Sequence, residues 1–293
     1  MVLAPPRMLI TDVFLQEDGH AQERRLIAEV LQDVKADDLW IEERNFCTLG
    51  LRLGIARRGA AFVVRQHGQV QGELVGRLTY KGASRSGPVY EQPLLVRAPE
   101  RGETMRVRRI TVKLTEPTRD GDTELHILSN VPTRRASAVQ LARLYGKRWS
   151  IETAFGEITT TLSCEINPLG YPKAALLTFC LAFLAYHAVS LSKAALRSAH
   201  GRQQGNDEVS GYDRALEIGR TYDGMMIAIP APHWALFRAL SAKELANALR
   251  ELASSVNLAR YQKHPRGPKQ TPPKRTAYQN GKHVSTAKLL AQR

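Results

Sequence analysis

Apolar residues recur at helical spacing through residues 141–162. At about 100° per residue, one side of such a helix carries an apolar stripe made of Leu144, Ile151, Phe155, Ile158 and Leu162. The flank beside this stripe carries Tyr145, Arg148, Glu152 and Thr159, whereas Glu157 falls on the opposite side, toward solvent. The pattern therefore predicts a helix that holds the carboxylate of Glu152 at the edge of a core.

Before this stretch, mixed helices and strands give way to strands alone. Residues 7–15 and 39–41 have strand character, the latter as a short buried strand, and residues 21–34 and 45–57 have helical periods. Strand, helix and strand form a crossover unit, so we expect the first two strands in one sheet. Gly, Pro and Ser turns then separate five further strands, expected at residues 62–65, 73–80, 92–97, 105–114 and 124–128.

The strand expected at residues 105–114 alternates basic and apolar residues in part. One of its faces would be buried, and the other would carry Arg106, Arg108 and Lys113. Basic side chains in such a row can follow a phosphate backbone. An edge strand protected by charge explains the same pattern equally well.

The run from residue 174 to residue 192 contains no charged side chain and approaches the length that spans a bilayer. It includes His187 and three Ser or Thr residues, and one lysine brackets it at each end, which gives no orientation bias. We therefore expect a buried core helix and no membrane partner. His187 is then a satisfied core or edge histidine rather than a ligand.

Polar and helical segments alternate toward the C-terminus. Residues 199–211 are polar, residues 212–218 predict a short helix, and residues 234–258 predict one or two helices, with Ser241 and Glu244 in a capping box. The tail from residue 260 carries many Lys and Arg residues but no Asp or Glu, and its prolines oppose regular structure. Such a tail either binds nucleic acid by counterion release or is simply solvated.

The charge of the whole chain favours a polyanionic partner. A formal net charge of +14 and a pI near 10.0 point most simply to nucleic acid. An anionic membrane surface is the competing partner, and a basic proteome gives the same total. Cys47, Cys164 and Cys180 are scattered in apolar surroundings without zinc spacing. Reduced thiols and an N-terminus without a signal-peptide pattern predict a cytoplasmic protein.

Glu152 is the strongest candidate for chemistry. An arginine one turn earlier, Arg148, favours the ionised carboxylate, and a positioned carboxylate suits a hard divalent cation such as Mg²⁺. An ordinary Arg–Glu pair four residues apart on an amphipathic helix explains the same spacing.

Three blocks of sequence resemble one family. Tyr145, Arg148 and Glu152, with Trp149 and Ile151 between them, look like the signature helix of IS4-family DDE transposases. Two further blocks agree in order: residues 39–48 followed by 58–65 are similar to the block around the second acid of the family's triad, and residues 125–132 resemble the strand that leads into the signature helix.

The resemblance implies that Glu152 is the third acid and Glu43 the second, together holding Mg²⁺ or Mn²⁺ for in-line displacement at phosphorus. Most family members have Asp in place of Glu43, whose extra methylene moves the carboxylate by about 1.5 Å. Thr159 stands where the family usually has Lys. The first acid belongs upstream of everything matched here, and Asp12 sits at the wrong point in the order. We therefore expect an N-terminally truncated, catalytically impaired transposase.

The implied fold class is α/β, a partial RNase H-like (retroviral-integrase-like) core with a β-rich insertion before the catalytic helix and a helical C-terminal region. The divisions expected are the first half of the core, the insertion, the signature and core helices, the helical C-terminal region and the basic tail. Their residues are, in that order, 1–59, 60–132, 133–198, 199–259 and 260–293.

The implied partner is double-stranded DNA at transposon ends, bound in the bacterial cytoplasm with the nucleoid, with a homodimer as a further expectation. The residues expected to contact DNA are Tyr145, Arg148, Lys147, Arg44, Arg106, Arg108, Lys113, Lys269, Lys274 and Arg275. Two alternatives remain open: a DNA-binding remnant without catalysis, and a basic protein that meets RNA nonspecifically.

Overall fold

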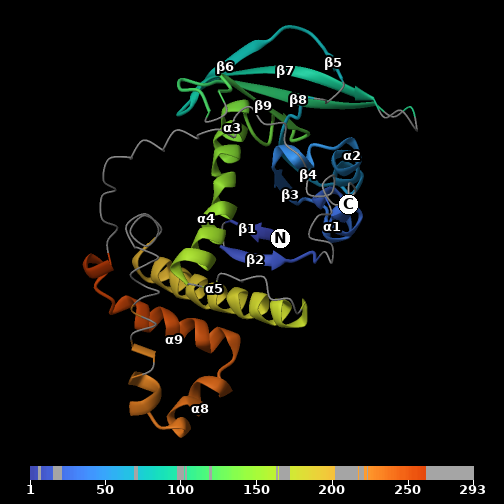
Figure 1. The fold of residues 1–293 in the computed structure, drawn as a ribbon. Helices are drawn as coiled ribbons and strands as arrows, with labels where there is room; N and C mark the ends of the chain where they lie inside the picture. Colours follow the sequence, from blue (N-terminus) through green and yellow to red (C-terminus); the bar gives the residue numbers. More distant parts are fainter. Residues whose placement is uncertain are drawn as a thin grey trace, which may run out of the picture. The chain divides into compact units, whose positions relative to one another are not determined.

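The computed structural model shows two compact units. One unit comprises Phe14–Ser150, and the other comprises Met1–Val13 together with Ile151–Arg293 (Figure 1). Each unit is described by itself. The residues that the structure describes are 1–5, 8–15, 22–68, 72–97, 102, 104–118, 121–162, 164, 172–201, 217, 221–222 and 224–261.

A seven-stranded mixed sheet forms the framework of the unit Phe14–Ser150. Its first two strands are parallel, and every other pairing is antiparallel. The strands lie in the order β3 (Leu39–Glu42), β4 (Ala61–Arg65), β9 (Glu124–Ser129), β8 (Thr104–Lys113), β7 (Gly87–Arg97) and β5 (Glu73–Leu74), and β6 (Thr79–Ser84) pairs with β7.

The parallel pair β3–β4 needs a crossover connection, which helix α2 (Leu49–Arg57) supplies. The helix begins after Thr48, whose side chain accepts a hydrogen bond from the backbone N–H of Leu51. A 3₁₀ turn, η2 (Arg44–Phe46), precedes it. The first helical region of the unit is divided between η1 (Glu23–Leu26) and α1 (Ile27–Asp33), so both helices expected in this part of the chain are confirmed.

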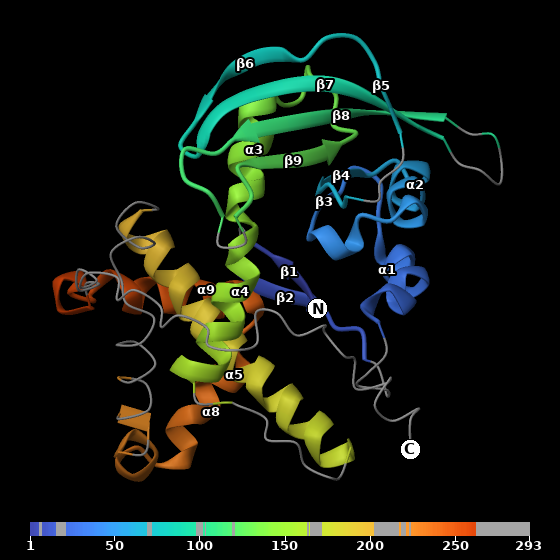
Figure 2. The ribbon, with the colours of Figure 1, turned by 45° about the horizontal axis from the view of Figure 1, so that its top comes forward.

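Strand alternation gives the sheet two apolar faces. Phe62 and Val64 of β4 face one cluster, in which Leu51 and Ile55 of α2 pack beside α1. Val63, between them in sequence, faces the opposite cluster under α3 (Ala138–Gly146). Figure 2 shows α1 and α2 together near β3 and β4, with α3 crossing the other strands. The sheet is therefore covered by helices on both faces.

The second unit combines a small sheet with helices. Strands β1 (Val2–Ala4) and β2 (Leu9–Asp12) form an antiparallel pair. The helices are α4 (Ser150–Gly156), the π-helical turn η4 (Glu157–Thr161), α5 (Pro172–His200), α8 (Ala231–Ala239), α9 (Ala242–Ser254) and the 3₁₀ turn η5 (Leu258–Tyr261). In both views α9 runs beside α5. The predicted capping box of Ser241 and Glu244 opens α9 and is confirmed.

One face of α5 forms the core of this unit. Phe183 and Tyr186 pack against Ile10 of β2 and against Ile158 of η4. His187 accepts a hydrogen bond at Nε2 from the backbone N–H of Ile10, at 3.1 Å. The expectation of a satisfied histidine is thus confirmed.

The opposite face of α5 carries exposed leucines, which include Leu177, Leu181 and Leu184. The expectation of a buried core helix is therefore right for one face only. Residues Lys173–His200 are long and apolar enough to cross a membrane by length and composition, and 22% of the most apolar window is buried. Core helices of soluble proteins meet the same criterion.

Three expectations about the strands need correction. The strands expected at residues 7–15 and 39–41 do not share a sheet, because β2 pairs with β1 whereas β3 pairs with β4. The single strand expected at residues 73–80 is two strands, β5 and β6, that pair with different parts of β7. Leu39 is exposed rather than buried, because β3 lies at the edge of the sheet. Most of the short helix expected at 212–218, and the tail beyond Tyr261, lie outside the described residues.

Candidate functional site

Two consecutive carboxylates end strand β3 and belong to different faces of the sheet. Glu42 is buried and pairs in register with Val64, whose side chain packs under α2. Glu43 follows with extended backbone (φ −76°, ψ 161°), so its side chain belongs to the α3 face. Its Oε2 accepts a hydrogen bond of 2.8 Å from the backbone N–H of Asn45. This cap of η2 holds the carboxylate through one of its two oxygens.

The residues predicted around Glu43 gather on the α3 face. Burial raises the pKa of Tyr145, the positive charges of Arg148 and Arg65 act to lower it, and the negative charge of Glu43 acts to raise it. A charge shifts the pKa of another group appreciably only when the two groups lie close together. Glu43, Arg148 and Arg65 therefore lie in the neighbourhood of Tyr145.

Arg148 is held between two aromatic rings. Its guanidinium carbon lies 5.9 Å from the ring centroid of Tyr145 and 5.4 Å from that of Trp149, within the range of cation–π attraction. Tyr145 is buried in the cluster under α3, and Trp149 is exposed. Tyr145 was predicted to contact DNA, and its burial favours a role in supporting Arg148 instead.

Arg65 was not among the site residues predicted from the sequence. It ends β4, and its guanidinium Nη2 lies 2.5 Å from Oδ2 of Asp122. A signal was present in the sequence, because the carboxyl ends of two parallel strands meet at the same edge of a sheet. Glu43 and Arg65 each follow or end one strand of the parallel pair.

On the opposite face, Glu42 is part of a buried polar group with Arg52 and Cys47. Burial raises the pKa of Glu42 to about 8, and the charge of Arg52 offsets part of this rise. Neither carboxylate oxygen has a hydrogen-bond partner among the described residues. Burial likewise lowers the pKa of Arg52 and raises the pKa of Cys47. Glu42 is thus protonated at neutral pH and faces away from the Glu43 cluster.

Glu152 lies in the first turn of α4 and is exposed. It belongs to the unit that begins at Ile151, whereas Glu43 belongs to the unit Phe14–Ser150. The pairing of these two carboxylates around a shared metal therefore stays a prediction.

The apolar stripe expected around Glu152 is rotated. Phe155 is 44% exposed, whereas Ala154 and Ile158 are buried. A 3₁₀ turn, η3 (Lys147–Trp149), precedes α4. Within the unit Ile151–Arg293, packing against α5 buries Ala154 and Ile158, while Glu152 and Phe155 are exposed.

The expectation that Glu157 faces solvent is wrong. Its Oε1 accepts a hydrogen bond from Nζ of Lys193 at 2.6 Å, and the two side chains are only 16% and 11% exposed. Thr159, on the same turn, is exposed, and its hydroxyl donates to the backbone carbonyl of Phe155.

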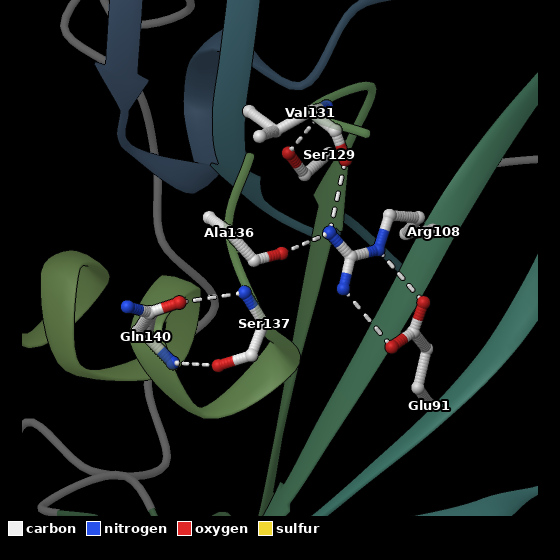
Figure 3. A network of polar contacts seen from close by, with 7 residues as sticks. All are labelled: Glu91, Arg108, Ser129, Val131, Ala136, Ser137 and Gln140. Atoms are coloured by element: carbon white, nitrogen blue, oxygen red, sulfur yellow. Dashed lines mark hydrogen bonds and ion pairs between the residues drawn. The ribbon is translucent and has the colours of Figure 1, made fainter. Parts of the chain in front are cut away.

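Arg108, expected to contact DNA, is engaged within the protein (Figure 3). Its Nε and Nη2 donate to the two carboxylate oxygens of Glu91 at 2.7 and 3.0 Å. Its Nη1 donates to the carbonyl oxygens of Val131 and Ala136 at 2.9 and 2.7 Å. Four of the five N–H groups are thus used, so we assign Arg108 a structural role that ties β8 to β7 and to the loop before α3.

The expected basic row on β8 is also divided between two faces. Arg106 lies on the face of Arg108 and is exposed. Lys113 is an odd number of residues away and therefore lies on the other face, where its Nζ is 5.2 Å from the ring centroid of Tyr90. Arg44 and Lys147 are exposed, as a contact with DNA requires. Lys269, Lys274 and Arg275 lie outside the described residues.

The donor atoms of Glu43 and Glu152 fit a hard divalent cation, because carboxylate oxygens are the ligands that Mg²⁺ prefers. Within the described ranges, however, no group of three or more His, Cys, Asp or Glu side chains gathers closely enough to hold a metal ion. These two residues would therefore supply part of a ligand set.

Comparison with known proteins identifies the family of this chain. A family described as the transposase DDE domain matches residues 4–187. The chain is also 32% identical over 154 residues to a protein of Sinorhizobium fredii (strain NBRC 101917 / NGR234) named "Putative transposase y4zB". That alignment covers 51% of this chain and 39% of the relative, so the chain spans about two fifths of the relative's length. Since the family match covers more than half of the residues and includes Glu43, Arg148 and Glu152, this chain belongs to the transposase DDE domain family.

Proposed function

We propose that this chain takes part in DNA transposition as an IS4-type DDE transposase, with an RNase H-like core and metal-dependent cleavage and transfer of DNA strands. The observation that carries the proposal is the cluster of Glu43, Arg65, Tyr145 and Arg148 at the end of the parallel strand pair. Neighbouring carboxylate and guanidinium groups suit a DNA backbone with its divalent cation, because the carboxylate can bind the cation and the guanidinium can bind the phosphate.

Each group in the cluster has a distinct task. Glu43, and Glu152 from the other unit, would hold Mg²⁺ or Mn²⁺, which when bound activates the attacking hydroxyl and stabilises the leaving oxygen. Arg148, whose guanidinium lies near the rings of Tyr145 and Trp149, would offer a planar fork of donors to a phosphate. Arg44 and Lys147 add positive charge at the surface, which attracts the DNA backbone.

We further propose that catalysis is weak. A carboxylate displaced by about 1 Å can lose roughly 10²-fold in rate, and Glu43 carries one methylene more than the residue usual in the family. Thr159 also supplies no positive charge where the family usually has Lys. The proposed partner is double-stranded DNA, with transposon ends as its specific target and a homodimer as the form that pairs two ends.

Nicking of supercoiled plasmid in the presence of Mg²⁺ or Mn²⁺ tests the proposal, because one nick converts the plasmid to the open-circular form. We expect Glu43→Gln and Glu152→Gln to abolish nicking. Glu42→Gln is the matched control, because this neighbouring carboxylate faces the opposite side of the sheet and should leave nicking intact. Activity that survives Glu152→Gln would contradict the role of that residue.

A second function, DNA binding without catalysis, is favoured by one observation: the described residues gather no set of three potential metal ligands. The same preparation distinguishes the two functions. Salt-sensitive binding to a duplex, without nicking under either metal, would support the second and refute the first. Tighter binding to RNA than to DNA of equal length would contradict both.

A further inference from the structure

A short polar contact joins the helical segment that carries Glu152 to α5. Helix α4 continues directly into the π-helical turn η4, whose first residue is Glu157. Oε1 of Glu157 accepts a hydrogen bond from Nζ of Lys193, in the second half of α5, at 2.6 Å. Glu157 was expected to face solvent, so this contact is a product of the tertiary structure.

The Glu157–Lys193 pair is shielded from solvent, unlike ordinary ion pairs at a protein surface. Its side chains are 16% and 11% exposed, whereas those of the surface pair Glu73–Arg97 are 66% and 74% exposed and 3.4 Å apart. Exposed pairs of that kind contribute little. A short, charge-assisted contact away from water is stronger and has a defined geometry.

Apolar side chains of the two helices also pack against each other. Ala154 and Ile158 pack against Ala182, Phe183 and Tyr186 of α5. Apolar attraction has no preferred direction, and Ala154 presents only a methyl group. Such a surface holds α4 against α5 without fixing its rotation about its own axis. The ion pair adds the directional contact that the apolar surface lacks.

The turn where this pair forms is itself unusual. Residues Glu157–Thr161 adopt π-helical geometry, which is rare and occurs frequently at functional sites. Glu157 is the first residue of this turn and lies about 140° around the helix from Glu152, five residues earlier. Glu157 can therefore lie against α5 while Glu152 is exposed.

We propose that Glu157 and Lys193 are positioning residues for Glu152: their ion pair fixes the rotation of α4 against α5 and so aims the Glu152 carboxylate. That this orientation serves metal binding rests on the function proposed above. The orientation itself is a property of the unit Ile151–Arg293 and can be measured without DNA or metal.

Spin labels at positions 152 and 198 test the orientation directly. Glu152→Cys and Ser198→Cys place one label on α4 and one on the exposed side of α5, in a full-length chain whose three native cysteines are changed to alanine. We expect one narrow distance distribution between the labels. Lys193→Met should broaden or shift this distribution, Lys193→Arg should preserve it because the cation remains, and Lys173→Met should leave it unchanged because Lys173 is exposed at the other end of α5.

An unchanged distribution in Lys193→Met would overturn the proposal. So would the loss of the narrow distribution in Lys193→Arg. If Lys193→Met fails to fold, as judged by its circular dichroism, Glu157→Gln provides the same test with a side chain of equal size. The distribution in that variant should broaden, and an unchanged one counts against the pair.

Nicking then connects the orientation to the function. In Mn²⁺ at saturating concentration, Lys193→Met should nick plasmid about 10- to 100-fold more slowly than the wild type, with the same affinity for duplex DNA. A merely structural role would alter both. If the wild type nicks nothing, the proposed function fails, but the label distances still decide whether the pair positions residue 152.

Discussion

Glu42 and Glu43 are adjacent in the chain but belong to opposite faces of one sheet. Glu42 is buried under α2, and burial raises its pKa to about 8. Glu43 caps η2 on the other face, near Tyr145. Since side chains of a strand alternate, one step along the backbone separates a buried carboxyl group from the carboxylate that we propose binds metal.

The raised pKa of Glu42 predicts that stability falls as pH rises. Between about pH 4.5, its usual pKa, and about pH 8, the folded chain holds a proton on Glu42 that the unfolded chain has released. The free energy of unfolding should therefore decrease by about 1.4 kcal/mol per pH unit in this window. Urea denaturation at several pH values measures this slope.

Glu42→Gln should remove this contribution to the slope, because glutamine stays neutral at every pH. The slope of the unfolding free energy against pH is measured for both proteins. The difference between the two slopes gives the contribution of Glu42 apart from the other titrating groups. Equal slopes in the two proteins would show that Glu42 is ionised in the folded state, contrary to the structure.

Arg108 should matter for stability more than for DNA. Arg108→Met leaves the carboxylate of Glu91 without its partner at a site where both side chains are almost buried, 12% and 13% exposed. Breaking a buried pair in this way typically costs about 3–5 kcal/mol. Chemical denaturation should show a loss of this size. Arg106→Ala, on the same face of β8 but exposed, should change stability by less than about 0.5 kcal/mol.

The double variant Glu91→Gln with Arg108→Met serves as the internal check. Removal of both charges should restore a large part of the lost stability, because no unpaired carboxylate remains. A double variant as unstable as Arg108→Met alone would mean that the bonds to Val131 and Ala136 carry the effect instead.

Gly87 should tolerate no side chain. It begins β7 with φ +134°, a conformation that L residues rarely adopt, and a Cβ atom there would lie 1.9 Å from the carbonyl oxygen of Lys113. Gly87→Ala should cost about 3 kcal/mol or more. Gly50→Ala is the matched control, because Gly50 lies in α2 with open space around it. Alanine favours the helix there by about 0.5–1 kcal/mol, so denaturation should show a small gain.

The salt dependence of DNA binding should identify the residues that contact phosphate. Arg44→Ala and Lys147→Ala each remove one exposed charge, so each should lower the slope of log K against log salt concentration by about 1. Arg108→Met should leave this slope unchanged, because that guanidinium is already bonded within the protein. A smaller slope for Arg108→Met than for the wild type would show that Arg108 contacts DNA after all.

The sequence by itself determined most of the local elements. Period-2 and helical patterns placed most strands and helices within a few residues, because alternation and helical spacing report local geometry directly. The block around Tyr145, Arg148 and Glu152 pointed to an IS4-family DDE transposase, and the comparisons show the broader transposase DDE domain family.

Only the tertiary structure decided which faces these residues occupy and which partners they meet. Glu157, which the helical pattern placed toward solvent, pairs with Lys193 of α5. The pairing of β2 with β1 removed it from the larger sheet. Arg108 met Glu91 on a strand 17 positions earlier, which no local spacing reveals. Patterns along a chain fix period and type, whereas rotation, strand partner and ion-pair partner depend on contacts between residues distant in sequence.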